Sequence, residues 1–502
     1  MPMQTLNELI FLASNFITIV VSVGVVVLIV TVITLYIKDR TQTSHAILRN
    51  YPVIGRFRYY FEHLGEFFRQ YFFSLDRDEM PFNRSERSWV YRSAKKIDNT
   101  IAFGSTRRID EDGTILFANN QTPILDSEAL PTPPVTIGSY CKNPYQTASL
   151  VNISAMSFGA ISEPAVLALS KGAKKCGCWF NTGEGGLSPH HLAGGCDIIF
   201  QIGTAKYGVR ELDGSLSKTK LQSIAAIPEV KMFELKLSQG AKPGKGGILP
   251  AIKITQEVAD IRGIEVGKDS ISPNRHLEIK SVNELLDFIS MIRDVTGKPV
   301  GIKTVLGEYE WIQELCEKIL QRGQEYAPDF ITLDSTDGGS GAAPMSLMDY
   351  VGLPIRETVP QTVNILLEAN LKKRIMVCAS GKLITPDKVA WAYALGADFV
   401  NTARGFMFAL GCIQSLKCNL NTCPTGITTH DKKLQRGLNP TDKAERVANY
   451  ARGLSKEVET ISHSCGVAHP RLLRRKHVRL LRRFGPSLRL DEIRPYPKNT
   501  SM

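Results

Sequence analysis

Eight short β-like runs lie between residues 149 and 403: SLVNIS (149–154), CWFNTG (178–183), IIFQIG (198–203), FELKLS (233–238), VGIKTV (300–305), FITLDS (330–335), IMVCAS (375–380) and FVNTA (399–403). Helical stretches separate most of them, and alternation of this kind predicts parallel β/α units. Eight such units predict an α/β fold with a closed (β/α)8 TIM barrel.

Polar and glycine-rich segments stand where most of these runs end. They are SAMSFG (154–159), NTGEGG (181–186), KLSQGAK (236–242), Lys303, DSTDGGSG (334–341), SGK (380–382) and TARG (402–405). Turn-forming glycine is the commoner explanation of any one such segment. Seven of them around one ring favour a binding site, because barrels of this class carry their active sites at the carboxyl ends of the strands.

The segments SGK and TARG follow the last two strands, where such barrels often hold a phosphate. Glycine lets backbone N–H groups approach a phosphate closely, and Lys382 and Arg404 add positive charge. No G-x-G-x-x-G motif follows a strand and opens a helix, so the sequence favours FMN over a dinucleotide. Lys303, inside an otherwise apolar strand, is expected to face the flavin pyrimidine edge.

Three cysteines, Cys412, Cys418 and Cys423, stand in GCIQSLKCNLNTCPTG with the spacing C-x5-C-x4-C-P. Thiolates bind iron–sulfur clusters or zinc, and a proline after the last cysteine recurs in ferredoxin-type loops. A structural zinc site takes four ligands, so three cysteines favour a three-iron, four-sulfur cluster, or a four-iron cluster completed by another ligand. Ordinary buried cysteines are the alternative. The other seven cysteines lack the spacing of a disulfide scaffold and are expected to be reduced.

The run FITIVVSVGVVVLIVTVITLYI (16–37) carries no charge and matches the thickness of a bilayer core. Only Glu8 is charged before it, which does not fit the basic start of a signal peptide. Lys38, Arg40 and Arg49 follow at close range, so the positive-inside rule places the chain beyond them in the cytoplasm. We therefore predict a single-pass protein of the cell membrane with a cytoplasmic catalytic part.

The net charge of +12 lies at the two ends: residues 38–96 carry +5, residues 469–502 carry +8, and residues 97–468 sum to zero. Segment 51–73 interleaves aromatic residues with arginines, as does a helix lying in a membrane interface. HPRLLRRKHVRLLRRFG (469–485) could reach anionic lipid or form a solvated or intersubunit helix. No nucleic-acid partner is predicted, because no nucleic-acid-binding fold accompanies this basic stretch.

Six motifs together resemble the synthase domain of glutamate synthase, over roughly residues 130–430. The motifs are MSFGAIS, FNTGEGG, KLSQGAKPGKGGILP, ISPNRH, DGGSGAAP and CNLNTCPTG, in the order of that family. The resemblance implies an FMN-binding barrel with a 3Fe-4S cluster. It also implies reduction of 2-iminoglutarate, formed from 2-oxoglutarate and ammonia, to L-glutamate. The single-span anchor resembles a membrane-attached bacterial branch that lacks the other glutamate synthase domains.

The resemblance also implies residue roles. Cys412, Cys418 and Cys423 would be the cluster ligands, and Lys236, Gln239 and Lys242 would bind the dicarboxylate. Glu184 lies where the family brings ammonia toward the flavin, which makes Lys303, Glu184 and Lys242 the expected catalytic residues. The expected flavin contacts are Met156, Ser157, Lys303, Gly339, Gly381, Lys382, Ala403 and Arg404.

The chain departs from full-length glutamate synthase in several places. It begins Met-Pro-Met and continues into the apolar run, so it is expected to lack its own glutaminase and to use free ammonia or ammonia from a separate glutaminase. No nicotinamide-oxidising module is recognisable, so electrons are expected from an external carrier. The segments ITTH (427–430), SGK and ISPNRH differ from the usual family pattern, which leaves the exact substrate open.

Two other functions stay open on the sequence. One is a flavin oxidoreductase of the same barrel that acts on another amino acid or an N-substituted amino acid. The other is a non-catalytic redox or scaffold subunit of a membrane complex, against which the substrate loop argues. The expected divisions are an extracytoplasmic segment (1–15), a transmembrane helix (16–37), an aromatic juxtamembrane lead-in (38–129), the barrel (130–430) and a helical basic extension (431–502).

Overall fold

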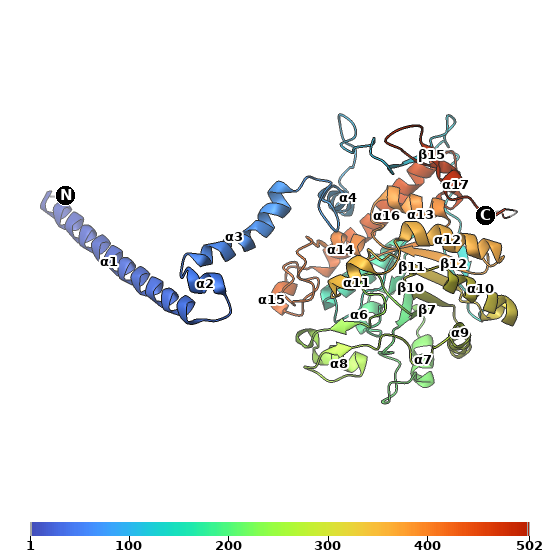
Figure 1. Cartoon of the computed structure of the whole chain (residues 1–502), viewed down its shortest axis with the longest axis horizontal. Helices are drawn as coiled ribbons and strands as arrows, with labels where there is room; N and C mark the ends of the chain where they lie inside the picture. The colour runs from blue at the N-terminus through green and yellow to red at the C-terminus, as the bar shows by residue number, and fades with distance from the viewer. Residues whose placement is uncertain (1–2, 499, 501–502) are drawn as a thin grey trace. The chain divides into compact units, whose positions relative to one another are not determined.

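The computed structural model describes residues 3–498 and residue 500, and the chain divides into two compact units, Met1–Arg84 and Ser85–Met502 (Figure 1). The first unit is helical, with α1 (Met3–Thr41), α2 (Ala46–Asn50), α3 (Gly55–Phe68) and a π-helical turn η1 (Arg69–Phe73). Residues 3–15, expected as a separate segment, belong to α1, and residues 1–2 lie outside the described part. Within α1, Asn7–Thr41 is long and apolar enough to cross a membrane.

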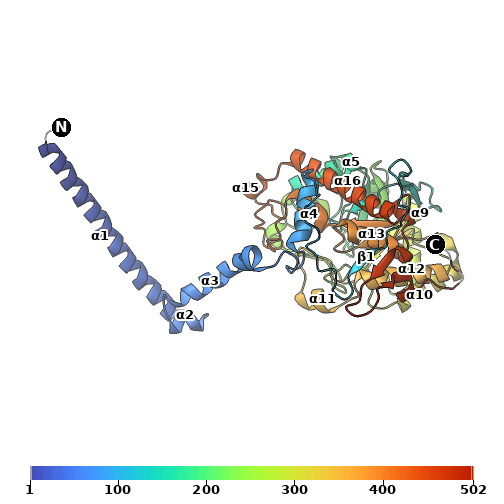
Figure 2. The same ribbon diagram turned by 90° about the horizontal axis from the view of Figure 1, so that it is seen from above.

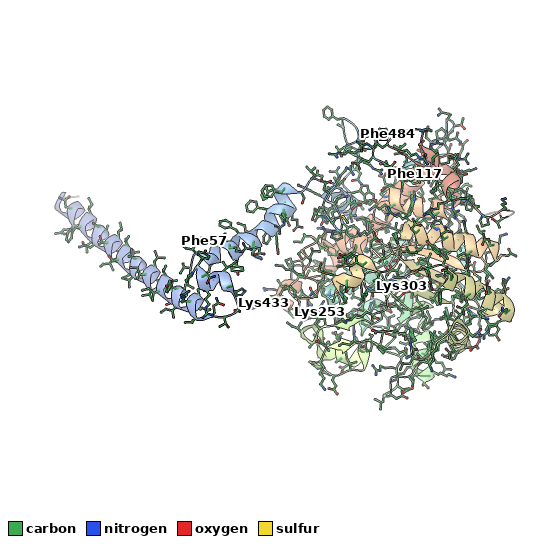
Figure 3. The ribbon with its side chains drawn as sticks, viewed as in Figure 1. Phe57, Phe117, Lys253, Lys303, Lys433 and Phe484 are labelled. Carbon is green, nitrogen blue, oxygen red and sulfur yellow. The ribbon has the colours of Figure 1, made fainter. Side chains whose placement is uncertain are left out.

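A buried carboxylate fixes the turn that follows α1. Asp39 accepts hydrogen bonds from the Val53 N–H at 3.0 Å and from Arg56 Nε at 2.9 Å. Arg56 belongs to α3, so this side chain joins the end of the apolar helix to the start of the aromatic one. Phe57, labelled in Figure 3, and Phe61 are among the exposed aromatic residues of α3.

The second unit is built on a closed barrel of eight parallel strands, which confirms the predicted (β/α)8 architecture. The strands are β4 (Val151–Ile153), β5 (Phe180–Asn181), β6 (Ile198–Ile202), β7 (Val230–Lys236), β10 (Val300–Thr304), β11 (Phe330–Asp334), β12 (Met376–Ser380) and β13 (Phe399–Thr402). Seven of them fall within a predicted run, and β7 overlaps the run 233–238 but begins three residues before it. The ring closes where β13 pairs with β4, with Asn401 opposite Asn152.

Helices follow the strands in the expected alternation and cover the barrel. They are α5 (Glu163–Cys176), α6 (Pro189–Leu192), α7 (Lys218–Ala225), α9 (Val282–Thr296), α10 (Glu310–Arg322), α12 (Ile355–Glu368), α13 (Pro386–Leu395) and α16 (Pro440–Ser464). Local sequence sets several boundaries. The Ser162 side chain caps α5 at its start by accepting the Ala165 N–H, and Gly177 ends it with φ of 72°.

Helix α16 closes the helical layer of the barrel. It packs against α5 on one side and α13 on the other, the place of the eighth helix (Figure 2). At the α13 side, the Tyr450 hydroxyl donates to the Ile384 carbonyl at 3.0 Å. The barrel thus draws its last helix from residues that the sequence analysis assigned to the C-terminal extension.

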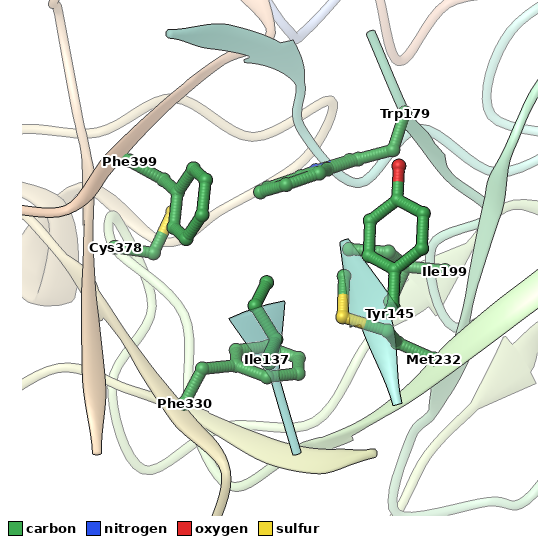
Figure 4. Close-up of a cluster of buried hydrophobic side chains, with 8 residues drawn as sticks. All are labelled: Ile137, Tyr145, Trp179, Ile199, Met232, Phe330, Cys378 and Phe399. Carbon is green, nitrogen blue, oxygen red and sulfur yellow. The ribbon is translucent and has the colours of Figure 1, made fainter. Parts of the chain in front are cut away.

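A hairpin seals the amino-terminal end of the barrel. It consists of β2 (Val135–Ile137) and β3 (Tyr145–Thr147), which pair antiparallel. Ile137 and Tyr145 from this hairpin pack on barrel residues such as Trp179 and Phe330 in a buried apolar cluster (Figure 4). The Tyr145 hydroxyl donates to Asp197 Oδ2 at 2.8 Å. Because this end is filled, access to the barrel lies at the carboxyl ends of the strands.

The remaining elements lie in long connections and at the chain's end. They are α4 (Arg84–Ala94), β8 (Ile248–Leu249), η2 (Ala251–Lys253), α8 (Gln256–Arg262), β9 (Ser270–Ile271), η3 (Gln324–Tyr326), α11 (Met345–Tyr350), α14 (Arg404–Leu410), α15 (Lys432–Gln435) and α17 (Leu490–Ile493). A small sheet joins β1 (Ile115–Phe117), β14 (Val478–Leu480) and β15 (Leu488–Arg489).

The basic stretch 469–485 is not a helix, which corrects the helical reading of that tail. It forms two 3-10 turns, η4 (Pro470–Leu472) and η5 (Arg475–His477), and then strand β14. Arg475 is fully buried and donates to the carbonyls of Pro360 at 3.0 Å and Arg494 at 2.8 Å. Arg475 therefore binds carbonyl groups inside the protein and is not available to bind lipid.

Candidate active site

A pocket opens at the carboxyl ends of the barrel strands and holds about 1060 Å³ of empty space, including its mouth. Predicted site residues in its wall are Met156, Ser157, Glu184, Lys236, Gln239, Lys242, Lys303, Gly339, Ala403, Arg404 and Cys418. These residues come from segments far apart in the sequence, and the ring of strand ends brings them together. Gly381, Lys382, Cys412 and Cys423 are not part of this wall.

Glu184 and Lys236 form an ion pair in the pocket wall, with little of either side chain exposed. Lys236 Nζ lies 2.9 Å from Glu184 Oε1 and also donates to Gln239 Oε1 at 2.8 Å. Glycine makes room for the carboxylate, because a Cβ on Gly247 would lie 2.2 Å from Glu184 Oε1. The pair therefore joins the loop after β5 to the carboxyl end of β7.

The surroundings of this cluster lower the pKa values of both Glu184 and Lys242. Burial opposes the Glu184 charge, but Lys236, Lys242 and Arg262 hold its pKa at about 2. Burial, with the nearby Lys236 charge, lowers the pKa of Lys242 to about 8. Glu184 is therefore ionised at neutral pH, while Lys242 gives up its proton far more easily than an ordinary lysine.

Lys303, labelled in Figure 3, is a buried cation on β10. Its Nζ lies 3.5 Å from Asp334 Oδ2 at the end of β11. Two further donors fix that carboxylate: the Gly240 N–H and the Ser380 hydroxyl, each at 2.8 Å. Burial works against the Lys303 charge, but Asp334 and Glu234 raise its pKa above the ordinary value. Lys303 is thus a permanent cation.

The loops after β11, β12 and β13 meet beside the pocket. Gly381 has φ of 136°, and a Cβ there would lie 2.3 Å from the Ser335 Cβ. Lys382 also has a positive φ, of 43°, and its Nζ lies 3.5 Å from Asp337 Oδ2. From the third loop, Arg404 donates to the Ser340 carbonyl at 3.2 Å. These loops pack closely against one another and carry the two cations Lys382 and Arg404.

The cysteine loop begins directly after α14. Cys412 and Cys423 are buried, and Cys418 reaches the pocket wall. The Gln414 N–H points at Cys412 Sγ, 3.5 Å away. Helix α4 supports the loop, because the Tyr91 hydroxyl donates to the Cys412 carbonyl at 2.5 Å. Among the described residues, no three His, Cys, Asp or Glu side chains are gathered closely enough to hold a metal ion.

Several residues of the site escaped the sequence analysis. Lys253 lines the pocket and donates to the Cys418 carbonyl at 3.2 Å and the Ala160 carbonyl at 2.7 Å. Burial lowers its pKa to about 8. No local sequence motif marks this lysine, and only its contacts with residues distant in the sequence place it in the site.

Glu234 could have been found from the sequence. It is a charged residue inside an apolar strand, the signal that singled out Lys303. The structure buries it in the barrel, where it accepts hydrogen bonds from Asn181 Nδ2, Gln201 Nε2 and Thr332 Oγ1, each at 2.7 Å. Gln201 itself lines the pocket, so this carboxylate braces the pocket floor.

Comparison with known proteins agrees with this geometry. Residues 94–468 match a family described as the conserved region in glutamate synthase. The chain belongs to the glutamate synthase family. The match includes α16 and the cysteine loop as well as the barrel, and family members are oxidoreductase enzymes, as is this chain.

Two relatives illustrate the range of this glutamate synthase family. The glutamate synthase large subunit-like protein YerD of Bacillus subtilis is 42% identical over 91% of this chain and 94% of its own length. The archaeal-type glutamate synthase [NADPH] of Thermotoga maritima is 33% identical over 71% of this chain and 63% of its own length. Among solved structures, a mandelate oxidase mutant aligns over 79% of this chain and 92% of its own with 14% identity and a TM-score of 0.43. The fold assignment rests on the strand order described above.

Proposed function

We propose that this glutamate synthase family enzyme reduces 2-iminoglutarate, formed from 2-oxoglutarate and ammonia, to L-glutamate. The arrangement of Lys236, Gln239 and Lys242 supports this most directly, because two buried lysines and an amide suit a dicarboxylate. They share one pocket with Lys303. A non-catalytic redox subunit would have no use for such a set.

The residues fit FMN as the cofactor. The glycine positions carry this test: a Cβ at Gly381 would collide with Ser335, and one at Gly339 would lie 2.7 Å from Arg404 Nε. These positions leave the close backbone approach that a phosphate needs, and Lys382 and Arg404 supply positive charge. FMN, when bound, supplies reducing equivalents as hydride.

The protein's own groups then bind substrate and manage protons. Lys236 and Gln239 orient one carboxylate, while Glu184 keeps Lys236 in place. Lys242, with its pKa of about 8, holds a proton at Nζ that it can pass to the substrate nitrogen as that nitrogen gains electrons. Lys303 provides a fixed positive charge where negative charge develops.

Cys412, Cys418 and Cys423 match an iron–sulfur cluster in ligand type, although the described residues do not gather three metal-binding side chains. They are three thiols on one loop, two of them buried, with a backbone N–H directed at one sulfur. A 3Fe-4S cluster held there would pass single electrons toward the pocket that Cys418 lines. Electrons would come from an external carrier, and nitrogen from free ammonia or a separate glutaminase.

We also propose attachment to the cell membrane through α1, with the catalytic unit in the cytoplasm. The helix is long and apolar enough to span, and Lys38 and Arg40 stand at its end. Sedimentation with membranes after alkaline washing would support a spanning helix. Full release by that wash would contradict it.

The decisive assay uses the detergent-solubilised protein under anaerobic conditions with an artificial reductant, 2-oxoglutarate and ammonium. We expect L-glutamate to accumulate, and both substrates to be required. Lys242→Ala should lower the rate at least about tenfold, since a positioned proton donor contributes about a hundredfold or more. Lys245→Ala is the matched control, because Lys245 is exposed on the same loop.

Failure of the intact, flavin-loaded protein to form glutamate would refute this function. Turnover of another amino acid or an N-substituted amino acid by the same preparation would then favour the related oxidoreductase. Equal rates in wild type and Lys242→Ala would remove the assigned proton donor while leaving the reaction class in place.

A further inference from the structure

Two thiols meet at the amino-terminal end of the barrel, away from the pocket. Helix α5 ends at Cys176, Gly177 turns the chain with φ of 72°, and Cys178 leads into β5. The turn folds the two cysteine side chains toward each other, so that their Sγ atoms lie 3.3 Å apart. Both cysteines are free.

We infer that Cys176 and Cys178 form an oxidisable pair that closes reversibly into a disulfide. A disulfide bond is about 2.05 Å long, so the two sulfur atoms need to approach by only about 1.3 Å. The chain already supplies the turn that brings them together. The neighbouring N–H groups support it, because those of Gly177 and Cys178 both donate to the Ala173 carbonyl, at 2.9 and 3.2 Å.

The two thiols differ in a way that assigns their roles. Cys176 is partly exposed and Cys178 is buried. The hydrogen bond from Cys178 holds the pKa of Cys176 below its usual value although burial opposes this, and Arg452 acts in the same direction. A Cβ on Gly177 would meet no atom within 4 Å, so the turn is open on that side. Cys176 is therefore the attacking thiolate and Cys178 the resolving thiol.

A third cysteine nearby, Cys196, is not expected to take part in this oxidation. Cys196 is buried and lies 3.6 Å from the Ser170 hydroxyl. Burial raises its pKa to about 12, so it forms little thiolate at neutral pH.

With hydrogen peroxide as oxidant, the chemistry balances. The Cys176 thiolate attacks one peroxide oxygen, the O–O bond breaks, and the departing hydroxide takes a proton to become water. The Cys178 sulfur then attacks the Cys176 sulfenic acid, the S–O bond breaks, and a second water leaves. Two thiols lose two electrons, and peroxide gains them. A dithiol reductant reverses the step by exchange.

The bond would act on the strand that leads to the pocket. Directly after Cys178, the Trp179 N–H donates to Asn152 Oδ1 at 3.1 Å, and β5 then runs to Asn181 and the loop with Glu184. A disulfide that spans a single intervening residue removes little conformational entropy from the unfolded chain, so it stabilises the fold little and is readily reduced. The pair is thus suited to reversible oxidation rather than to permanent cross-linking.

The test uses the reduced full-length protein in detergent, exposed to hydrogen peroxide, then denatured, alkylated and digested with trypsin. Residues 176–206 form one tryptic peptide that holds Cys176, Cys178 and Cys196 together. We expect this peptide to lose two hydrogens and to carry one alkyl group, at Cys196. Oxidation should be at least about tenfold faster than at buried Cys316, and dithiothreitol should reverse it.

Variants make the inference falsifiable without reference to glutamate synthesis. Cys176→Ser, a change at a partly exposed site, should leave Cys178 fully alkylated, whereas Cys196→Ser should still form the bond. Separate alkylation of Cys176 and Cys178 after peroxide treatment would overturn the inference. So would a Cys178–Cys196 link, or oxidation of Cys176 to sulfinic acid without pairing.

Discussion

Replacing Glu184 with glutamine tests the electrostatic account of the pocket. The carboxylate has a folded-state pKa of about 2 against an ordinary 4.5, a difference of about 2.5 units. At 1.36 kcal/mol per unit, its ionised form contributes about 3 kcal/mol to folding at pH 7. Because the pKa is depressed in the folded state, this stability is present above pH 4.5 and is lost as pH falls through 2.

The assay is denaturant unfolding of wild type and Glu184→Gln at several pH values. We expect the variant to be less stable by about 3 kcal/mol at pH 7, with roughly three quarters of that gap left at pH 4 and less than half at pH 3. Glutamine has the shape of the protonated acid, so the two proteins should converge in acid. Glu265→Gln, which removes an exposed ion pair with Lys268, is the control and should unfold like wild type.

Two results would refute this reasoning. One is an unchanged unfolding midpoint for Glu184→Gln at pH 7, which would mean that the ionised carboxylate beside the lysines adds no stability to the folded state. The other is a stability gap that stays constant from pH 7 to pH 3, which would point to lost packing rather than lost charge.

Other predictions concern the stability of the barrel, its retention of flavin and the rate of glutamate formation. Asp329→Asn should lower the free energy of unfolding by about 3 to 5 kcal/mol, because buried Asp329 pairs with Arg293 at 3.1 Å and Arg374 at 2.8 Å; denaturant unfolding measures this. Gly381→Ala should cost about 1 to 3 kcal/mol, since alanine is strained at a φ of 136°, and should weaken flavin retention in gel filtration. The rate of glutamate formation should fall above about pH 8, as Lys242 loses its proton, and a flat profile from pH 6 to 9 would contradict that role.

The sequence predicted the barrel because its signals are local. Each strand carries its own apolar run and its own polar end, and parallel closure places all those ends at one face. The polar segment from Lys236 to Lys242, which is proposed to bind the substrate, could be predicted for the same reason. Glu234 and Lys303 share one such signal, a charge inside an apolar strand, although only Lys303 was recognised.

What the sequence could not reveal depends on contacts between distant residues. Lys253 joins the pocket through carbonyls of Ala160 and Cys418, and neither contact leaves a local pattern. The stretch 469–485 interleaves leucines with arginines, as a helix might. Residues 478–480 nevertheless form strand β14, because they pair with residues 115–117. Likewise, α16 completes the barrel only through its packing on α5 and α13.

Charge distribution links the fold to the proposed chemistry. Residues 97–468 have no net charge, yet the pocket wall holds the cations Lys236, Lys242, Lys253, Arg262, Lys303 and Arg404 against the single carboxylate of Glu184. Burial lowers the pKa values of both Lys242 and Arg262, and the nearby Lys236 charge lowers that of Lys242 further. Bound anions would offset such an excess of positive charge. A phosphate-bearing cofactor and a dicarboxylate substrate would do so together, and each should therefore bind more tightly when the other is present.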